Sequence, residues 1–307
     1  MKAAYFLQHG GPEVLRYGEV PDPVAGPGEA LIDVHAASVN GADWKVRSGK
    51  SASITAFPHV PGRDFSGVIS ALAAGVTDLR VGDAVFGVCD AGREGAYAQK
   101  LAIRAAIVAR KPDALSHVEC AAVALVGLTA LVSIEDTLEL TSGETILIQG
   151  GAGGVAGFAV QLAKHIGARV ITTARAANHA YLRSLGADQI IDYETQDFTQ
   201  VVSGCDAVFD TVGGDVAARS LVVLRPGGRA AFIASRGVPL PSVRPDVALL
   251  RPNVARDRKH LERVVALVTG GAVRVPEITL YDLSQAAAAH AVSEARHLRG
   301  KLVFKLR

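Results

Sequence analysis

The feature that most constrains this chain is a cluster of glycines between two apolar segments. Residues 145–149 form an apolar run of strand length, and five glycines follow within the eight positions 150–157. Residues 155–166 then place apolar side chains at helical spacing on one face. The stretch therefore predicts a strand, a tight glycine turn and a helix.

The spacing of small residues in this turn fits a dinucleotide-binding fingerprint. Gly151, Gly153 and Ala156 match G-x-G-x-x-G/A, in which small residues permit the tight turn, the close approach of a pyrophosphate and helix-on-strand packing. The helix amino terminus offers free N–H groups to the phosphates. A lone glycine pattern also fits an ordinary tight turn, so the context decides. Gly167 as a helix cap and residues 169–174 as the next strand complete a β-α-β unit.

The end of this second strand indicates which nucleotide is bound. NAD-binding folds place an acid about 20 residues after the glycines, whereas a cationic neighbour suits the 2′-phosphate of NADP. Here Ala174 is followed by Arg175, and no carboxylate occurs between residues 169 and 181. Arg175 and His179 supply positive charge, which favours NADPH. The alternative is that Arg175 only solvates a loop.

The remaining pattern predicts two domains. Before residue 110, short apolar strands alternate with glycine and proline turns, which indicates a mostly β domain. After residue 180, helices and strands alternate, which specifies a parallel sheet covered on both faces. We predict an α/β fold with domains 1–115 and 116–250 and a segment 251–307 that returns to the first domain. The predicted strands are 15–19, 29–37, 64–72, 84–88, 96–102, 189–192, 206–210, 229–234 and 301–306, and the later helices are 180–185, 216–224, 256–269 and 284–295.

Composition excludes several classes of function. The chain has 307 residues and a formal net charge of +2 without a basic stripe, so we expect no nucleic-acid or membrane partner. Its three cysteines form no CxxC pair, which argues against structural zinc and disulfides and fits a reducing cytoplasm. The amino terminus lacks a signal-peptide hydrophobic region. The apolar stretch 120–134 is shorter than the ~20 residues of a spanning helix and predicts a buried helix.

Further motifs follow one another in the order of a known family. The sequence resembles the medium-chain dehydrogenase/reductase superfamily, and within it the zinc-independent quinone-reductase and enone-reductase branch, over nearly the whole chain. This resemblance implies a Rossmann-type doubly wound parallel sheet domain and a mostly β GroES-like catalytic domain. Its markers are residues 37–49, 60–67, 81–87, 127–130, the glycine motif with 161–164, 185–188, 210–214 and 299–301.

The same resemblance argues against a catalytic metal. In the zinc alcohol dehydrogenases of the superfamily, a cysteine stands where Asn40 does, and a His-Glu pair stands where Arg63 and Asp64 do. A catalytic zinc needs about three N, S or carboxylate ligands, which Asn40 and Arg63 cannot supply. His59 is a lone candidate, and a single histidine is more often structural. We therefore predict no metal.

Without a metal, hydride must pass to an acceptor that is already electrophilic, such as a quinone or an α,β-unsaturated carbonyl compound. Asn40 is the best candidate for positioning the substrate or the nicotinamide. The resemblance to an Asn-x-x-Asp-x-Lys pattern adds Asp43 and makes Lys45 a candidate electrostatic helper or proton donor. The alternative is that Asp43 and Lys45 form only a structural salt bridge.

The resemblance also places residues around the nucleotide. Family members often carry Ser and Lys where Arg175 and His179 stand, so we expect the grip on the 2′-phosphate to be rearranged. The implied contacts are Thr129 near the nicotinamide ribose or phosphates; Gly151, Ala152, Gly153, Gly154 and Val155 around the pyrophosphate; Ala174, Arg175, His179 and Tyr193 near the adenosine 2′-phosphate; and Asn40, Thr211, Val212, Gly213, Ile233 and Ala234 on the nicotinamide side.

The leading hypothesis is an NADPH-dependent, metal-free oxidoreductase of quinones or enones. One alternative is a 2-enoyl-thioester reductase, which typically uses a tyrosine proton donor, for which Tyr97 is the candidate. Another is an NADPH-binding sensor or structural protein. The family further implies a homodimer formed through the edge strand of the cofactor domain, predicted at 229–234. Acceptor specificity is expected to lie in loops such as 48–57 and 235–254.

Overall fold

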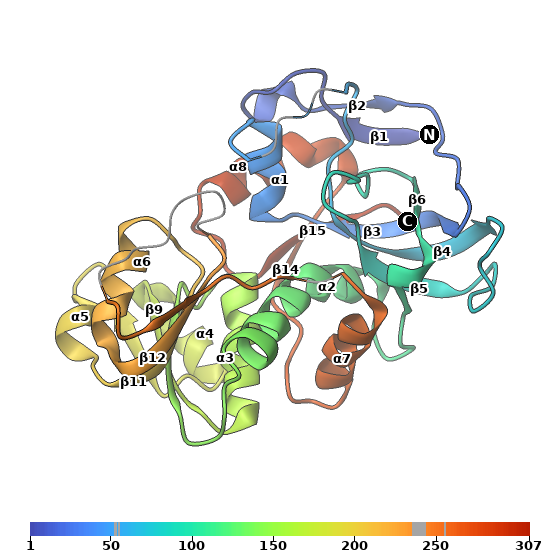
Figure 1. Ribbon diagram of the computed structural model, residues 1–307. Coiled ribbons are helices and arrows are strands. Elements are labelled where there is room, and N and C mark those ends of the chain that lie inside the picture. Colours follow the sequence, from blue (N-terminus) through green and yellow to red (C-terminus); the bar gives the residue numbers. More distant parts are fainter. Residues whose placement is uncertain (52–53, 55, 235–243, 255) are drawn as a thin grey trace. The chain divides into compact units, whose positions relative to one another are not determined.

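The computed structural model describes residues 1–51, 54, 56–234, 244–254 and 256–307, and the chain folds into two compact units (Figure 1). Unit 1 comprises Met1–Leu125, Arg256–Thr269 and Val275–Arg307, so it contains both chain ends. Unit 2 comprises Val126–Ala255 and Gly270–Arg274. The division between the two units falls inside helix α2 (His117–Leu131).

Unit 2 is built on a six-stranded parallel sheet with the order β10-β9-β8-β11-β12-β13. Numbered from β8, this is the order 3-2-1-4-5-6 of the doubly wound dinucleotide-binding fold, and it reverses between β8 and β11. The predicted Rossmann-type sheet is therefore confirmed. The strands are β8 Thr145–Gln149, β9 Arg169–Ala174, β10 Gln189–Asp192, β11 Cys205–Asp210, β12 Leu224–Phe232 and β13 Ala248–Leu250.

The helix after β8 is the predicted one. α3 (Gly154–Ile166) buries its apolar face and ends at Gly167, whose φ of 97° is a left-handed conformation that glycine adopts without a Cβ penalty. The predicted helix 216–224 is shorter, because residues 221–223 form a 3-10 turn. The other helices of this unit are α4 His179–Ser184, α5 Phe198–Val201 and α6 Asp215–Ser220.

The prediction that residues 229–234 form the edge strand is wrong. β12 pairs with β11 on one side and with β13 on the other, so its backbone groups are engaged within the sheet. β13 has only three residues, which is too short to show a strand pattern in the sequence. It is the outermost strand on this side of the described sheet. Residues 235–243 of the predicted specificity loop lie outside the described residues.

Unit 1 is mostly β, as predicted. Its main sheet has seven strands in the order β14-β15-β3-β4-β5-β7, with β6 also paired to β3. The predicted strand 96–102 is displaced to residues 100–104, because Tyr97 N–H binds the Pro61 carbonyl and Ala98 forms only an isolated bridge. The strands are β3 Glu29–Ser38, β4 Asp64–Leu72, β5 Ala84–Val88, β6 Lys100–Arg104, β7 Val108–Arg110, β14 Ile278–Tyr281 and β15 Lys301–Lys305, with β1 Lys2–Tyr5 and β2 Arg16–Glu19 as a separate antiparallel pair.

A buried arginine fixes helix α1 (Gly41–Arg47) against helix α8 (Ala286–Glu294). Arg47 is fully buried; it donates a hydrogen bond of 2.6 Å to Glu294 Oε2, and its Nη1 lies 3.2 Å from His290 Nδ1. Burial, aided by the Arg47 charge, lowers the pKa of His290 to about 3, so His290 is neutral and can accept. This contact anchors the helix that begins after Asn40. The remaining helix of the unit, α7, spans Arg258–Thr269.

The apolar helix that starts at His117 is longer than the sequence predicts, and it is buried. Together with the π-helical turn that follows α2, it spans His117–Thr137, which is 21 residues and apolar enough to cross a membrane by length and composition. The prediction that this stretch is too short to span is therefore wrong. The prediction of a buried helix is confirmed, since 78% of its apolar window is buried inside the fold.

Candidate functional site

The glycine turn lies at the point where the strand order of unit 2 reverses. Gln149 at the end of β8 pairs with Asp210 at the end of β11, so Gly150 and Thr211 follow neighbouring strand ends. The Thr211 hydroxyl donates a hydrogen bond of 2.7 Å to the Gln149 carbonyl. In doubly wound sheets, ligands bind outside the carboxyl ends of the strands at this reversal.

Packing around the turn requires small residues. A Cβ added at Gly151 would lie 2.2 Å from Thr172 Oγ1, and one added at Gly150 would lie 3.0 Å from Thr211 Oγ1. A Cβ added at Gly153 would lie 3.5 Å from the Gly150 carbonyl oxygen, an ordinary van der Waals distance, so this position is less tightly packed than Gly151. α3 starts at this point with no side-chain cap and no acidic residue in its first turn. The free N–H groups at the start of α3 fit the pyrophosphate of a dinucleotide.

The residues predicted for the 2′-phosphate are brought to adjacent strand ends. Ala174 of β9 pairs with Asp192 of β10, which places Arg175 and Tyr193 directly after two neighbouring strands. His179 Nε2 lies 3.4 Å from the Ala174 carbonyl oxygen. Arg175 Nε also lies 2.8 Å from Glu194 Oε1, in a pair whose side chains are 39% and 52% exposed. Such an exposed pair contributes ~0–1 kcal/mol, so a phosphate dianion can compete for Arg175.

The loop after β11 is held by a residue that was not among the predicted site residues. The Asp210 carboxylate is fully buried and accepts hydrogen bonds from the N–H groups of Val212 (2.9 Å) and Gly213 (3.0 Å). Burial raises the pKa of Asp210, and these backbone donors oppose the rise. Ile233 N–H donates to the Asp210 carbonyl (3.2 Å), and half-buried Ala234 follows. Elsewhere in unit 2, Thr129 on α2 is 8% exposed.

In unit 1, Asn40 stands between β3 and α1 as the helix N-cap. Its side-chain Oδ1 accepts a hydrogen bond of 2.8 Å from Lys301 Nζ. Its Nδ2 donates to the Ser38 carbonyl over 3.4 Å, and its backbone N–H donates to Asp43 Oδ2 (2.9 Å). Asn40 is 9% exposed, so its amide is nearly enclosed by these partners.

Asp43 supports Asn40 from within the protein. Besides the Asn40 N–H, its Oδ2 accepts a hydrogen bond of 2.8 Å from the Tyr97 hydroxyl. Arg63 Nε lies 3.9 Å from Asp43 Oδ1. Burial raises the pKa of Asp43 to about 6, with the charge of Arg63 acting in the opposite direction. Asp43 is 1% exposed, so it is a buried residue that supports the Asn40 backbone.

Lys45 does not join this group. Its Nζ lies 5.8 Å from the centre of the Trp44 ring, and Lys50 and Arg296 approach the same ring at 5.5 and 5.6 Å. Burial and then the Arg296 charge lower the pKa of Lys45. The alternative of an Asp43–Lys45 salt bridge is wrong, because side chains two positions apart on a helix face different directions and Asp43 faces Arg63.

Lys301 and Asp64 complete the group, although neither is a site residue predicted from the sequence. Lys301 is 3% exposed, donates to the Val39 carbonyl (2.7 Å) and lies 3.8 Å from Asp64 Oδ2. Ser38 Oγ donates to the same carboxylate over 2.5 Å. Burial raises the pKa of Asp64 and lowers that of Lys301, and the charge of each opposes the shift of the other. Both residues belong to motifs that the sequence shows, 60–67 and 299–301.

These residues do not fit a zinc ion. The Lys301 ammonium donates to Asn40, one of the positions where zinc-dependent relatives carry their ligands, and lies beside Asp64, so a second cation would be repelled. His59 is bridged to Phe6, with ring centres 5.1 Å apart, and burial lowers its pKa. Within the described ranges, no group of three or more His, Cys, Asp or Glu residues could hold a metal ion.

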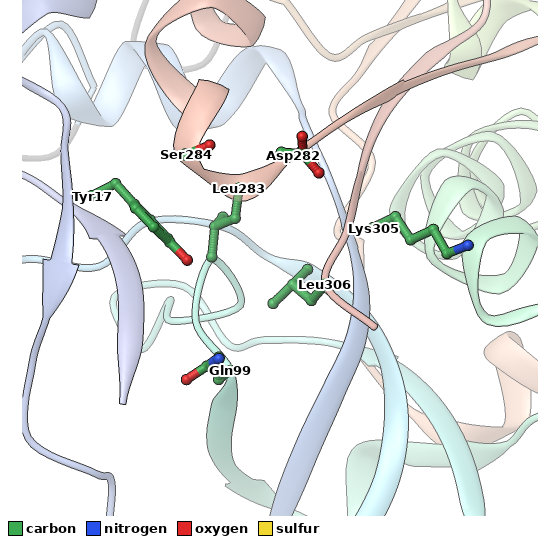
Figure 2. A pocket seen from close by; sticks show the side chains of 7 residues that line it. All are labelled: Tyr17, Gln99, Asp282, Leu283, Ser284, Lys305 and Leu306. Atoms are coloured by element: carbon green, nitrogen blue, oxygen red, sulfur yellow. The ribbon is translucent and has the colours of Figure 1, made fainter.

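A pocket of about 210 Å³ in unit 1 lies away from this group (Figure 2). Lys305 and Leu306 reach it at the far end of β15 from Lys301, about 13 Å along a strand. Figure 2 shows the Lys305 side chain directed away from Tyr17 and Gln99, so the polar groups do not converge. The lining residues are Tyr17, Gln99, Asp282, Leu283, Ser284, Lys305 and Leu306.

Comparison with known proteins agrees with both units. Residues 26–113 match the alcohol dehydrogenase GroES-like domain, and residues 185–304 match the zinc-binding dehydrogenase family. The chain is 35% identical over 250 residues to a 2-methylene-furan-3-one reductase from Solanum lycopersicum, which covers 78% of the chain and 63% of that protein. It is 30% identical to a quinone oxidoreductase from Pseudomonas aeruginosa, with 99% of both chains covered.

The fold matches a solved structure over its full length. The crystal structure of Escherichia coli quinone oxidoreductase complexed with NADPH is similar with a TM-score of 0.91 and 27% identity, with both chains covered completely. A doubly wound sheet with a dinucleotide turn and a GroES-like unit in one chain define an NAD(P)-binding oxidoreductase fold. The chain belongs to the medium-chain dehydrogenase/reductase superfamily, in its quinone and enone oxidoreductase branch. The relatives named above are a reductase and two quinone oxidoreductases.

Proposed function

We propose that this oxidoreductase transfers hydride from NADPH to a quinone or an α,β-unsaturated carbonyl compound without a metal. The observation that carries the proposal is the buried group of Asn40, Lys301 and Asp64, because it offers a hydrogen-bond donor where zinc-dependent relatives offer metal ligands. A donor can stabilise charge on the oxygen of an acceptor that is already electrophilic. Quinones and enones are acceptors of this kind.

NADPH fits the residues of unit 2. The turn at Gly153 and the start of α3 would hold the pyrophosphate, and Arg175, His179 and Tyr193 would hold the 2′-phosphate. The loop 211–213 would lie along the nicotinamide, kept in shape by Asp210. NADPH supplies the hydride when it is bound. The similar Escherichia coli quinone oxidoreductase was solved as a complex with NADPH, which supports this choice.

The residues of unit 1 would act on the acceptor. As hydride reaches the β-carbon of an enone, negative charge develops on the carbonyl oxygen, and a donor there contributes about 3–4 kcal/mol to the transition state. Asn40 is the proposed donor, with Asp43 holding its backbone in place. Lys45 remains a candidate proton donor, since its lowered pKa eases release of a proton.

The role of Tyr97 bears on the alternative of a 2-enoyl-thioester reductase. Tyr97 is fully buried, its hydroxyl donates to Asp43, and burial raises its pKa well above the usual value. In this arrangement the hydroxyl proton is directed at Asp43, and the raised pKa opposes its release. Tyr97 therefore gives no support to this alternative.

We also retain the proposals of a cytoplasmic location and of a homodimer. The described sheet of unit 2 ends in β10 (Gln189–Asp192) on one side and in β13 (Ala248–Leu250) on the other. Because β13 is the end strand beside β12, we propose that dimerisation by strand pairing would use β13. Sedimentation equilibrium at micromolar concentration tests the dimer, and a monomer there would contradict it.

The function is tested by oxidation of NADPH, with NADH in parallel, against one quinone, one short enone and one enoyl thioester, in chelator-treated protein. We expect saturable turnover of the quinone or the enone with NADPH preferred. Turnover of only the thioester would favour the thioester reductase. Tight NADPH binding without turnover across the panel would favour a sensor or structural protein, and dependence on added zinc would contradict the metal-free proposal.

A further inference from the structure

The contact between Lys301 and Asn40 determines how the Asn40 amide is oriented. An ammonium group has three donors and no acceptor, so the atom that faces it must be the carbonyl oxygen of the amide. Lys301 Nζ lies 2.8 Å from Asn40 Oδ1. The Nδ2 group is thereby turned away from Lys301, and its hydrogen bond to the Ser38 carbonyl is 3.4 Å long.

Lys301 is itself held firmly in place. Its ammonium donates to the Val39 carbonyl (2.7 Å) and lies 3.8 Å from the Asp64 carboxylate, which accepts from Ser38 Oγ. These partners come from β3, the residues after it, and β4, whereas Lys301 is the first residue of β15. Strand pairing of β15 with β3, Val303 opposite Ser38, fixes the distance between them.

We infer that Lys301 is a positioning residue that keeps Asn40 a hydrogen-bond donor, and not an acceptor, toward the carbonyl oxygen of the substrate. This inference rests on the proposed function, since it assigns the polarity of the same site. Nδ2 has two hydrogens; its hydrogen bond to the Ser38 carbonyl is long and weak, and the Asn40 side chain also donates to the Asp64 carboxylate, which opposes the rise that burial causes in the pKa of Asp64. A substrate oxygen that gains negative charge can therefore compete with the Ser38 carbonyl for an Asn40 N–H.

The consequence for specificity is that the site favours acceptors whose oxygen becomes an enolate or a phenolate. Such an oxygen is a strong acceptor of hydrogen bonds and needs a donor at the transition state. Without Lys301, the amide could rotate and present its carbonyl oxygen, which would repel the developing charge. Lys301 thus acts through Asn40 without touching the substrate.

Two matched substitutions of Asn40 distinguish its contact with Lys301 from its role as a hydrogen-bond donor to the substrate. Asn40→Asp keeps an acceptor for Lys301 and remains a good N-cap, but it has no N–H donor. Asn40→Leu has a side chain of the same size, but it has neither an acceptor for Lys301 nor an N–H donor. We expect Asn40→Asp to melt within about 2 °C of the wild type and Asn40→Leu about 4 °C below it. In both variants kcat should fall about 100-fold, because one donor is lost.

Substitutions of Lys301 test whether Lys301 positions the Asn40 amide. Lys301→Met, combined with Asp64→Asn to avoid an unpaired buried charge, should lower kcat about tenfold while the Kd of NADPH stays unchanged. It should lower kcat no further in the Asn40→Leu background. Lys301→Arg, which restores a donor, should recover most of the loss. The matched control is Lys100→Met, which removes another lysine ion pair of the same sheet, with Asp33 at 2.8 Å, and should leave kcat unchanged.

The outcomes are distinguishable. Asn40→Asp with near wild-type kcat would overturn the donor assignment, and Asn40→Asp as unstable as Asn40→Leu would overturn the Lys301 contact. A kcat loss from Lys301→Met that is equally large in the Asn40→Leu background would overturn the positioning role. If the wild type itself shows no turnover, the proposed function fails, while the melting temperatures still test the contact.

Discussion

The buried Asp43 carboxyl should make the stability of unit 1 fall as pH rises from 4 to 7. Asp43 is 1% exposed, and burial raises its pKa from the ordinary 3.8 to about 6 despite the nearby Arg63. The native state therefore binds this proton more tightly than the unfolded chain does. The stabilisation is complete below pH 4 and is lost as pH rises through 6. A difference of about 2 pH units, at about 1.4 kcal/mol each, corresponds to about 3 kcal/mol.

The substitution Asp43→Asn removes this titration and keeps an acceptor for the Tyr97 hydroxyl and the Asn40 N–H. The free energy of unfolding of the variant minus that of the wild type should rise by about 3 kcal/mol between pH 4 and pH 7.5. Urea unfolding at several pH values measures it, with the fluorescence of Trp44, the only tryptophan of the chain, as the probe.

The control is Asp90→Asn in the same unit. A hydrogen bond from Arg104 holds the pKa of Asp90 below its usual value, so Asp90 contributes stability that is present above pH 4 and lost in acid. The difference between this variant and the wild type should therefore stay nearly flat between pH 4 and pH 7.5 and rise only as pH falls below 4. A difference for Asp43→Asn that stays flat, or that falls as pH rises, would refute the conclusion that burial outweighs Arg63.

Three further predictions concern other residues of the two units. Arg175→Ala should raise the Kd of NADPH about tenfold or more and leave that of NADH nearly unchanged, as measured by titration calorimetry; an equal effect on both would remove Arg175 from the 2′-phosphate site. Gly151→Ala should destabilise unit 2 by about 1–3 kcal/mol and abolish NADPH binding, because its Cβ would lie 2.2 Å from Thr172 Oγ1. Gly153→Ala should fold normally, because its Cβ would lie 3.5 Å from the Gly150 carbonyl oxygen. Equal melting temperatures of the two variants would contradict the packing argument. Tyr97→Phe should lower stability by about 1–2 kcal/mol and raise the pKa of Asp43, yet retain turnover; loss of turnover in a folded variant would identify Tyr97 as a proton donor.

The sequence predicts unit 2 closely because each of its elements has a local signal. The glycine turn, the Gly167 cap and the alternation of strands and helices define β8, α3 and β9 within one residue of the structure. β13 has no such signal, because three residues carry no period, and the edge strand is misplaced for that reason. The apolar helix looks too short in the sequence because its π-helical extension, Val132–Thr137, includes Glu135 and Asp136, which end the apolar run.

The site of unit 1 could be predicted only in part. Asn40 and Asp43 lie three residues apart, so a local motif reveals them together. Lys301 is 261 residues from Asn40, and their contact depends on the pairing of β15 with β3, which no local pattern specifies. The same holds for Asp43 and Tyr97, 54 residues apart. The alternative of an Asp43–Lys45 salt bridge is wrong for the opposite reason, since closeness in sequence does not place two helical side chains on one face.

The fate of the hydride tests metal-free transfer from NADPH most directly. Chelator-treated protein should be given NADPH deuterated at C4, in each of its two stereochemical forms, together with a short enone, and the saturated product analysed by mass spectrometry and NMR. We expect one deuterium at the β-carbon of the product from one form of NADPH only. Saturated product without deuterium from either form, or product that appears only when zinc is added, would contradict metal-free hydride transfer from NADPH.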